Sequence, residues 1–378
     1  MSLILHTPDS KGELSNIYRH ALANAVELFI ITAFLTEWDD ISLKLNPDCR
    51  RFRVIIGKDF GITKKAACTK LMGWLPPERK SQFLVADRIS GFHPKAVFWK
   101  ESNGRSFAIV GSSNLTRAAF ETNYEANISC SLTPKEYASA KRWIKRIEKQ
   151  SLVVSEDWLK KYKEMPRRGP SKPQNGDEPV TPPIVPFNLP NPRGAVEIIT
   201  RRRRTLAAYK KNKVSLTNLF RRCAKGKITS PQFWDELPKY WSHDVGDRLT
   251  GPGFAIAAKH SDFRDLSRSF IKIINAGDED RDDVVVEEID RLSENRVPTR
   301  GAFLSEMLCL RFPDEYPVWN KPVKKYFRDV KLKAPRGASE GARFLDLAKK
   351  LRVSLLQNRH HPAKNLAELD AVIWLKYQ

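Results

Sequence analysis

Apolar and polar positions alternate in two different ways over roughly the first 150 residues. Short, nearly continuous apolar runs of strand length alternate with stretches whose apolar residues recur every three or four positions. The first kind is typical of buried strands and the second of amphipathic helices, so the pattern predicts an α/β domain. The expected strands are 26–34, 52–56, 82–85, 95–99, 107–110 and 124–130, and the expected helices are 13–22, 64–74 and one that follows Thr133.

The helix after Thr133 has a clear start signal. Thr133 is a suitable N-cap, Pro134 suits the first helical turn, and Glu136 supplies the carboxylate of a capping box. We expect the apolar stripe of this helix to face the core. The stripe consists of Tyr137, Ala140, Ile144 and Ile147.

Helical patterns dominate the second half of the chain. The last of these helices is expected to open with a capping box of Asn365 and Glu368 and to turn Leu366, Leu369, Val372 and Ile373 inward. The second half is therefore predicted to be mostly α. The expected helices are 215–223, 231–241, 264–274, 283–292, 303–310, 321–326, 338–351 and one from Asn365.

Two domains are expected, because 378 residues are more than one ordinary core holds. The boundary is a proline-rich segment without helical or strand period, which we interpret as a linker. The predicted organisation is a catalytic domain over 1–165, a linker over 166–192 and a basic, mostly helical domain over 193–378.

The chain has a large positive net charge, which indicates the kind of partner it binds. The chain carries 66 Lys and Arg against 44 Asp and Glu, a formal charge of +22, which favours a polyanionic partner. Nucleic acid and an acidic membrane surface both fit that charge. The apolar run Ala25–Leu35 is too short for a membrane-spanning helix, no signal-peptide pattern is seen, and the five cysteines are scattered. These features predict a cytoplasmic protein with reduced thiols.

The candidate chemistry begins with His93 and Lys95, which lead into the expected strand 95–99. Residues two apart on a strand share a face, so both side chains are expected to project toward one spot. An imidazole that attacks a phosphodiester needs a nearby cation, and Lys95 would supply it.

Two further strands add polar groups. Gly111, Ser112 and Ser113 end the strand 107–110 with small residues that let a phosphate oxygen approach, and Asn114 offers an amide donor. Glu125, on the strand 124–130, is a candidate to accept from a histidine ring N–H and fix its tautomer.

Together, the His93-x-Lys95 pair, the Gly111-Ser112-x-Asn114 turn and Glu125 resemble the active-site signature of the phospholipase D superfamily. The similarity is greatest to its metal-independent nucleases and restriction endonucleases, and covers roughly residues 1–150. The resemblance implies a phospholipase D-like sandwich domain with a central mixed β-sheet. It further implies His93 as a nucleophile that forms a phosphohistidine, with phosphate bound by Lys95 and Asn114, Ser112 assisting, Glu125 orienting the histidine, and no metal or other cofactor.

The sequence departs from the full superfamily motif in two ways. The Asp found five positions after the lysine is replaced by Lys100, which members acting on phospholipids usually do not show. The motif also occurs once, whereas the reaction needs a second histidine as acid and base. We therefore expect a homodimer that shares one active site.

A basic block accompanies this motif. From Arg193 to Lys227 there are twelve Lys and Arg against one acid, with Tyr209 and Phe220 interleaved. The block is expected to bind phosphate backbones, although a solvated flank has the same composition. The candidate nucleic-acid-binding residues are Arg201, Arg202, Arg203, Arg204, Lys210 and Lys211.

The remaining titratable residues are expected to be structural or solvated. None of the other six histidines has a metal-spaced partner. The acids of 278–290 suit a helix start better than a metal site.

The leading hypothesis is a DNA endonuclease that acts in restriction or phage defence, with RNA also open as substrate. The alternatives are a phospholipid hydrolase or phosphatidyltransferase and a catalytically inactive DNA-binding protein.

Overall fold

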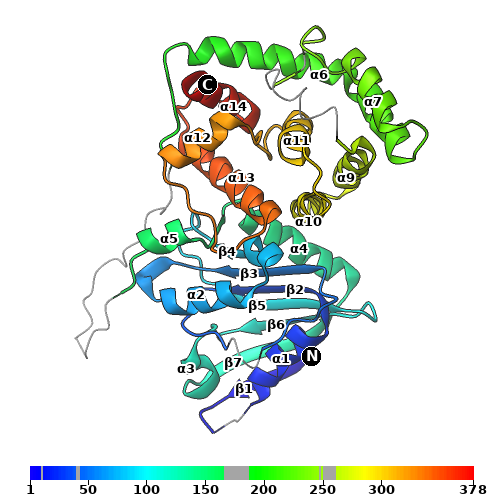
Figure 1. Ribbon diagram of the computed structural model, residues 1–378. Coiled ribbons are helices and arrows are strands. Elements are labelled where there is room, and N and C mark those ends of the chain that lie inside the picture. Colours follow the sequence, from blue (N-terminus) through cyan, green and yellow to red (C-terminus); the bar gives the residue numbers. More distant parts are fainter. Residues whose placement is uncertain (10–11, 40–42, 166–186, 247, 250–260) are drawn as a thin grey trace. The chain divides into compact units, whose positions relative to one another are not determined.

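The computed structural model describes residues 1–9, 12–39, 43–165, 187–246, 248–249 and 261–378 of the chain. The chain divides into two compact units (Figure 1). Unit 1 comprises Met1–Val185 and Lys333–Ala338, and unit 2 comprises Pro186–Leu332 and Ser339–Gln378. Most of the segment that we interpreted as a linker, 166–186, lies outside the described residues.

Unit 1 is built on a mixed sheet, in which the described residues form eight strands in the order β1-β7-β6-β5-β2-β3-β4-β8. Strands β2, β3 and β4 run parallel to one another, and the other neighbouring strands pair antiparallel. The strands are β1 (Ser2–His6), β2 (Ala25–Thr32), β3 (Arg51–Ile56), β4 (Phe83–Val85), β5 (Lys95–Glu101), β6 (Ser106–Gly111), β7 (Glu125–Leu132) and β8 (Leu152–Val153). The mixed α/β architecture predicted from the apolar pattern is thus confirmed.

Helices cover both faces of the central strands (Figure 1). On one face Tyr137 and Ile144 of α4 pack with Phe29 and Ile31 of β2. Helices α1 and α2 lie on the other face. Because β2 is buried on both faces, its sequence is a continuous apolar run rather than an alternating one. The helices of unit 1 are α1 (Glu13–Asn24), α2 (Lys65–Trp74), α3 (Arg117–Glu121), α4 (Pro134–Glu148) and α5 (Glu156–Lys161).

The predicted start of α4 is confirmed. The hydroxyl of Thr133 accepts from the backbone N–H of Glu136, and the Glu136 carboxylate accepts from the backbone N–H of Thr133. The pattern missed the sheet's two outermost strands, β1 and β8. The first is short and alternates exposed and buried residues, and the second has two residues, so neither produces a long apolar run.

Unit 2 is helical in its described part, as the sequence pattern predicts. Its helices are α6 (Ala195–Ala224), α7 (Ser230–Glu236), α9 (Phe263–Asn275), α10 (Arg281–Glu294), α11 (Ser305–Arg311), α12 (Lys321–Asp329), α13 (Glu340–Gln357) and α14 (Leu366–Tyr377). A π-helical turn, Arg300–Leu304, leads into α11. The expected helix 215–223 is only the end of α6, which starts twenty residues earlier.

The start of α14 differs in one contact from the expected capping box. Asn365 Oδ1 accepts from the backbone N–H of Glu368 at 2.8 Å, as expected. The Glu368 carboxylate accepts from the backbone N–H of Lys364 rather than of Asn365, and it also pairs with Arg203 at 2.8 Å. The Glu368 carboxylate therefore takes part both in the start of α14 and in the ion pair with Arg203 of α6. The predicted inward residues are buried: Leu366, Leu369, Val372 and Ile373.

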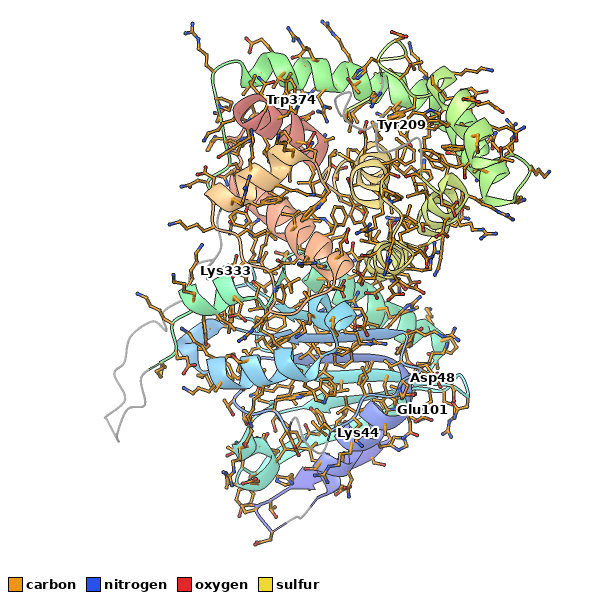
Figure 2. All side chains as sticks on the ribbon, in the orientation of Figure 1. Lys44, Asp48, Glu101, Tyr209, Lys333 and Trp374 are labelled. Atoms are coloured by element: carbon orange, nitrogen blue, oxygen red, sulfur yellow. The ribbon has the colours of Figure 1, made fainter. Side chains whose placement is uncertain are left out.

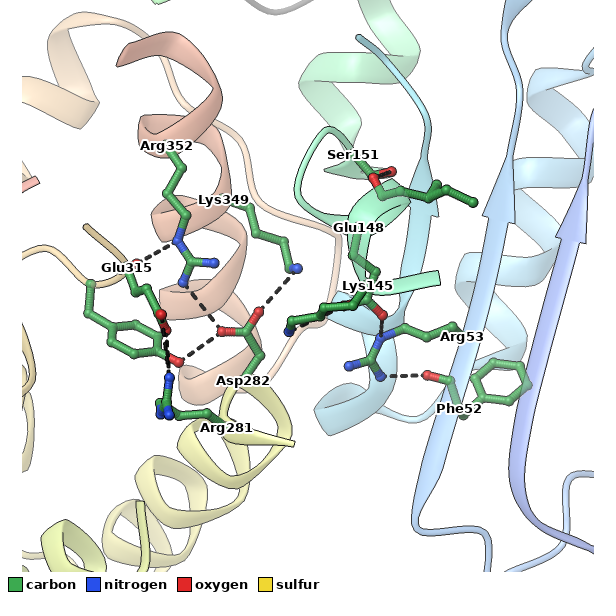
Figure 3. A network of polar contacts seen from close by, with 12 residues as sticks. Phe52, Arg53, Lys145, Glu148, Ser151, Arg281, Asp282, Glu315, Lys349 and Arg352 are labelled. Atoms are coloured by element: carbon green, nitrogen blue, oxygen red, sulfur yellow. Dashed lines mark hydrogen bonds and ion pairs between the residues drawn. The ribbon is translucent and has the colours of Figure 1, made fainter. Parts of the chain in front are cut away.

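The acids of 278–290 are used by ion pairs and by the start of α10. Asp282 accepts from the Tyr316 hydroxyl at 2.8 Å and pairs with Lys349 at 3.2 Å and Arg352 at 3.3 Å (Figure 3). Over the described ranges, no three His, Cys, Asp or Glu residues are grouped so as to hold a metal ion. Among the described helices, none combines the length and apolar character that crossing a membrane requires.

Candidate active site

The candidate catalytic residues lie at or directly beside the ends of strands that end or begin at the same end of the sheet, which we call the site end. There β1, β2 and β6 end, while β5 and β7 begin. The register places Lys95 opposite Thr32 and Gly111 opposite Asn127. Sheet pairing therefore brings together side chains that lie far apart in the sequence.

His93 and Lys95 lie close together but not on one strand. Strand β5 begins at Lys95, and the exposed His93 belongs to the loop before it. The Lys95 ammonium donates to the His93 carbonyl at 3.0 Å. Burial lowers the pKa of Lys95, and the negative charge of Glu125 opposes that shift. The expectation that His93 and Lys95 share a face of one strand is wrong, because His93 precedes the strand. The Lys95 cation nevertheless lies beside the histidine.

Asn114 has its amide orientation fixed by its neighbours. Its Oδ1 accepts from the Phe34 backbone N–H and from the Thr32 hydroxyl, both at 3.2 Å. A backbone N–H only donates, so the atom facing it must be the amide oxygen. The NH₂ group of Asn114 is consequently left as the donor for a ligand, as a phosphate-binding role requires.

Ser112 and Glu125 form one hydrogen-bonded group. The Ser112 hydroxyl donates a short hydrogen bond to Glu125 Oε2 and accepts from the Ala126 backbone N–H at 3.0 Å. Glu125 Oε1 accepts from the Asn123 amide at 3.1 Å. The hydrogen bond that we expected from a His93 ring N–H to Glu125 is not among those that the described residues make. Instead, Glu125 orients Ser112 and acts on Lys95 through its charge.

Several neighbours of this group were not singled out from the sequence. The Thr32 hydroxyl has one proton with two acceptors in reach, the Phe34 carbonyl oxygen at 3.0 Å and Asn114 Oδ1 at 3.2 Å, and it accepts from the Leu115 N–H at 3.1 Å. Phe34 meets the His93 ring edge to face, with centroids 5.6 Å apart. Burial and the charge of Glu125 raise the pKa of Tyr18 on α1. Thr32, Phe34 and Tyr18 belong to no recognisable sequence motif, so the sequence contains no signal that would identify them as neighbours of the site.

His6 is the second histidine at the site end. It is 4% exposed, ends β1, and lies opposite Glu125 in the β1–β7 register. Directly opposed residues of an antiparallel pair point to the same face. Neither ring nitrogen of His6 has a hydrogen-bond partner among the described residues. The sequence suggested only a structural or solvated role for His6, because Glu125, which faces it across the two strands, is distant in the chain.

The basic block lies on α6, where its members have different surroundings. Arg202 is buried and pairs with Asp370 at 3.0 Å, and Arg203 pairs with Glu368. The other candidates are exposed and form no ion pair with described residues: Arg201, Arg204, Lys210 and Lys211. Figure 2 shows Tyr209 on the inner side of α6 and nitrogen-tipped side chains along its outer side. The predicted phosphate-binding residues of α6 are thus reduced to those four exposed cations and the partly paired Arg203.

Comparisons with known proteins leave the family open. No model of a known protein family matches the chain, and no curated protein matches it either. Among solved structures, NucT from Helicobacter pylori is similar over 40% of this chain and 98% of its own, with 17% identity and a TM-score of 0.30. A likeness of that size does not assign a family, so membership of the phospholipase D superfamily stays a prediction from the motif.

Proposed function

We propose that the chain is a metal-independent phosphodiesterase that cleaves DNA through a phosphohistidine on His93. One observation carries the proposal: at the site end of the sheet, contacts and charge link Lys95, Ser112 and Glu125 beside an exposed His93, and Phe34, which contacts the His93 ring, also holds Asn114. An imidazole nucleophile with an adjacent cation and an oriented amide donor suits the attack on a phosphodiester.

The reaction proceeds in two steps. A ring nitrogen of His93 attacks phosphorus, so that an N–P bond forms, the P–O bond to the leaving oxygen breaks, and an acid protonates that oxygen. The acid, now deprotonated, takes a proton from water. The resulting hydroxide attacks phosphorus, the N–P bond breaks, and His93 is regenerated with the second product ending in a phosphate.

The neighbouring residues stabilise charge on the phosphate oxygens. Lys95 supplies a positive charge, and the Asn114 NH₂ group donates a hydrogen bond, because its oxygen is held by Thr32 and Phe34. Glu125 opposes the effect of burial on the pKa of Lys95 and so helps keep its charge. Hydrogen bonds hold both groups in place before the substrate binds, from Lys95 to the His93 carbonyl and from Thr32 and Phe34 to the Asn114 oxygen.

A substrate panel tests the proposal. Purified full-length protein is incubated in EDTA with plasmid, single-stranded DNA, RNA and phosphatidylcholine vesicles. Cleavage of DNA that His93→Ala abolishes is the expected result. Loss of all cleavage in EDTA with recovery in Mg²⁺ would overturn the metal-independent mechanism, and hydrolysis of the lipid alone would overturn the choice of substrate.

The acid and base is proposed to be His93 of the partner subunit in a twofold dimer. The proposal is supported by the exposure of His93, which leaves it open to a second copy, and by the presence of one His-x-Lys pair in the chain. A twofold axis beside His93 would bring both imidazoles to one phosphate.

Mixed dimers test this arrangement. Wild-type chains are co-refolded with increasing shares of His93→Ala chains while scattering confirms a constant amount of dimer. If both histidines are needed, activity falls as the square of the wild-type fraction. A linear fall would give the acid–base role to a residue of the same chain, and His6→Phe would then be the next variant to assay.

A nucleic acid is the proposed substrate class because α6 of unit 2 presents exposed cations and carries a single acid, Glu197, and the substrate panel separates DNA from RNA. Such a surface binds phosphate backbones regardless of sequence. Unit 2 would thus supply affinity, while the site end of unit 1 supplies the chemistry.

A further inference from the structure

The residue proposed as nucleophile lies on a loop. Between β4 and β5 the chain runs through residues 86–94 without forming a helix or a strand, and His93 is the second-last residue of that stretch. A misplacement of about 1 Å lowers a catalytic rate by roughly 10²-fold, so a loop nucleophile requires an external support. The contacts of the loop identify such a support.

Asp59 holds the loop just before His93. Its Oδ2 accepts from the backbone N–H of Gly91 at 2.9 Å and of Phe92 at 3.3 Å. The carboxylate is 2% exposed, so water competes little for these hydrogen bonds. Gly91 has φ +67°, a conformation that glycine adopts without strain and that turns its N–H and the next one toward the same oxygen.

Lys58 holds the other end of the same loop. Its ammonium lies 3.1 Å from Asp87 Oδ1, with both side chains at most 1% exposed. The Trp158 indole also donates to Asp87 Oδ1 at 3.3 Å. Burial lowers the pKa of Lys58, and the charges of Asp87 and Asp59 oppose that shift. Two consecutive residues after β3 thus contact both ends of the loop.

Packing leaves the loop little room between those two contacts. Phe92 is buried in the core with Phe29 and Ile31. Gly57 lies against it so closely that a Cβ there would come within 3.1 Å of the Phe92 carbonyl oxygen. Beyond the loop, Phe34 contacts the His93 ring and is itself packed on Phe60, which has φ +61°. Both the backbone and the ring of His93 are therefore supported.

We infer that Asp59 is a positioning residue for His93, and that the Lys58–Asp59 turn fixes the loop 86–94 for catalysis. The inference rests on the proposed function, since it takes His93 as the nucleophile. Asp59 acts through the backbone of Gly91 and Phe92 and contacts no substrate. Its removal should lower the rate of the chemical step and leave DNA binding largely unchanged.

The test compares Asp59→Ala with Asp59→Asn in the full chain. We expect Asp59→Ala to lower kcat by roughly 10- to 100-fold with a KM change of less than about 2-fold. Asp59→Asn keeps an oxygen acceptor for both N–H groups and should recover most of kcat. The matched control is Glu148→Gln, a buried acid of unit 1 that accepts from Arg53 at 2.6 Å (Figure 3). That control should lower Tm but not kcat per folded molecule.

A second pair of variants disturbs the loop without touching a charge. A Cβ at Gly91 meets nothing within 4 Å, so Gly91→Ala strains the backbone alone, and it should lower kcat as Asp59→Ala does. Gly104→Ala is the matched control, because Gly104 has φ +85°, equally open surroundings and a place in the β5–β6 turn. If Asp59→Ala fails to fold, the comparison of Gly91→Ala with Gly104→Ala still tests whether the conformation of the loop 86–94 controls kcat.

The ring signals of ¹³C-labelled histidines give a readout that does not depend on turnover. The His93 signal, assigned by its loss in His93→Ala, should broaden or split in Asp59→Ala, while that of buried His361 stays unchanged. An unchanged His93 signal with unchanged kcat overturns the inference, as does an equal kcat loss in Glu148→Gln or Gly104→Ala. A wild-type chain that cleaves no phosphodiester overturns the proposed function instead, and the signals alone then decide whether Asp59 fixes the loop.

Discussion

The site end of unit 1 and helix α6 of unit 2 gather polar residues in opposite ways. At the site end, Lys95 and Glu125 begin two strands, Ser112 directly follows a third, and strand pairing brings them together. On α6, four consecutive arginines separate again: Arg202 is buried with Asp370, while Arg204 is exposed. Adjacency in the sequence is thus neither needed for a site nor enough to make one.

The difference follows from the two kinds of backbone. Antiparallel pairing places residues of different strands opposite one another on one face. An α-helix turns by about 100° per residue, so consecutive side chains point in different directions. A cluster of polar residues on a sheet therefore depends on pairing between distant segments. A cluster on a helix depends on residues that are three or four positions apart.

The largest effect is expected from His93→Ala. Turnover should fall by at least about 10³-fold, because the variant has no imidazole to form the covalent intermediate. The Kd for DNA should change by less than about 2-fold, because phosphate contacts elsewhere supply the affinity. Cleavage assays and fluorescence anisotropy on the same preparation measure both. A variant that cuts at a rate comparable with wild type would remove His93 from the mechanism.

Arg202→Ala should destabilise unit 2 rather than weaken DNA binding. The change leaves the buried Asp370 carboxylate, whose pKa burial raises, without its cation, which costs about 3–5 kcal/mol of unfolding free energy. Urea unfolding measures the loss. The exposed Arg201→Ala, as control, should stay within about 0.5 kcal/mol of wild type. Equal effects of the two variants would contradict the division of the block into buried and exposed arginines.

The double variant Arg204→Glu, Lys211→Glu should weaken DNA binding for all sequences. The slope of log K against log salt should become shallower by about 1 for each DNA phosphate that the variant no longer neutralises. Titrations at several salt concentrations measure that slope, and Lys324→Glu on α12 is the control for a charge reversal elsewhere in unit 2. An unchanged slope would favour the solvated-flank alternative for the block.

The smallest effect concerns pH. Glu125 raises the pKa of Lys95 against the effect of burial, so Glu125→Gln should lower that pKa. Lys95 then loses its charge at lower pH, and the alkaline limb of kcat/KM should move down by less than about one pH unit. The quantity to measure is the pH at which kcat/KM falls on the alkaline side, rather than the maximum value of kcat/KM. A limb that stays in place or moves up would mean that Lys95 does not limit the alkaline rate.

Much of the fold could be predicted because its signals are local. The buried run of β2 and the cap of α4 lie within a few residues of sequence, and both are found where the pattern placed them. The length of α6 could not be predicted, because four consecutive arginines interrupt the apolar pattern of its first half and are held in part by tertiary pairs such as Arg202 with Asp370. Helical periodicity is weak where ion pairs replace apolar contacts.

The residue types available for chemistry can be read directly from the chain: an imidazole, a lysine, an amide, a hydroxyl and a carboxylate in a fixed order. Which of them contact one another depends on the folded structure. Register placed His6 opposite Glu125, the Phe34 N–H set the amide of Asn114, and Asp59 came to hold the loop of His93. The physical reason is that hydrogen bonds between distant segments depend on strand pairing and burial, which no local pattern encodes.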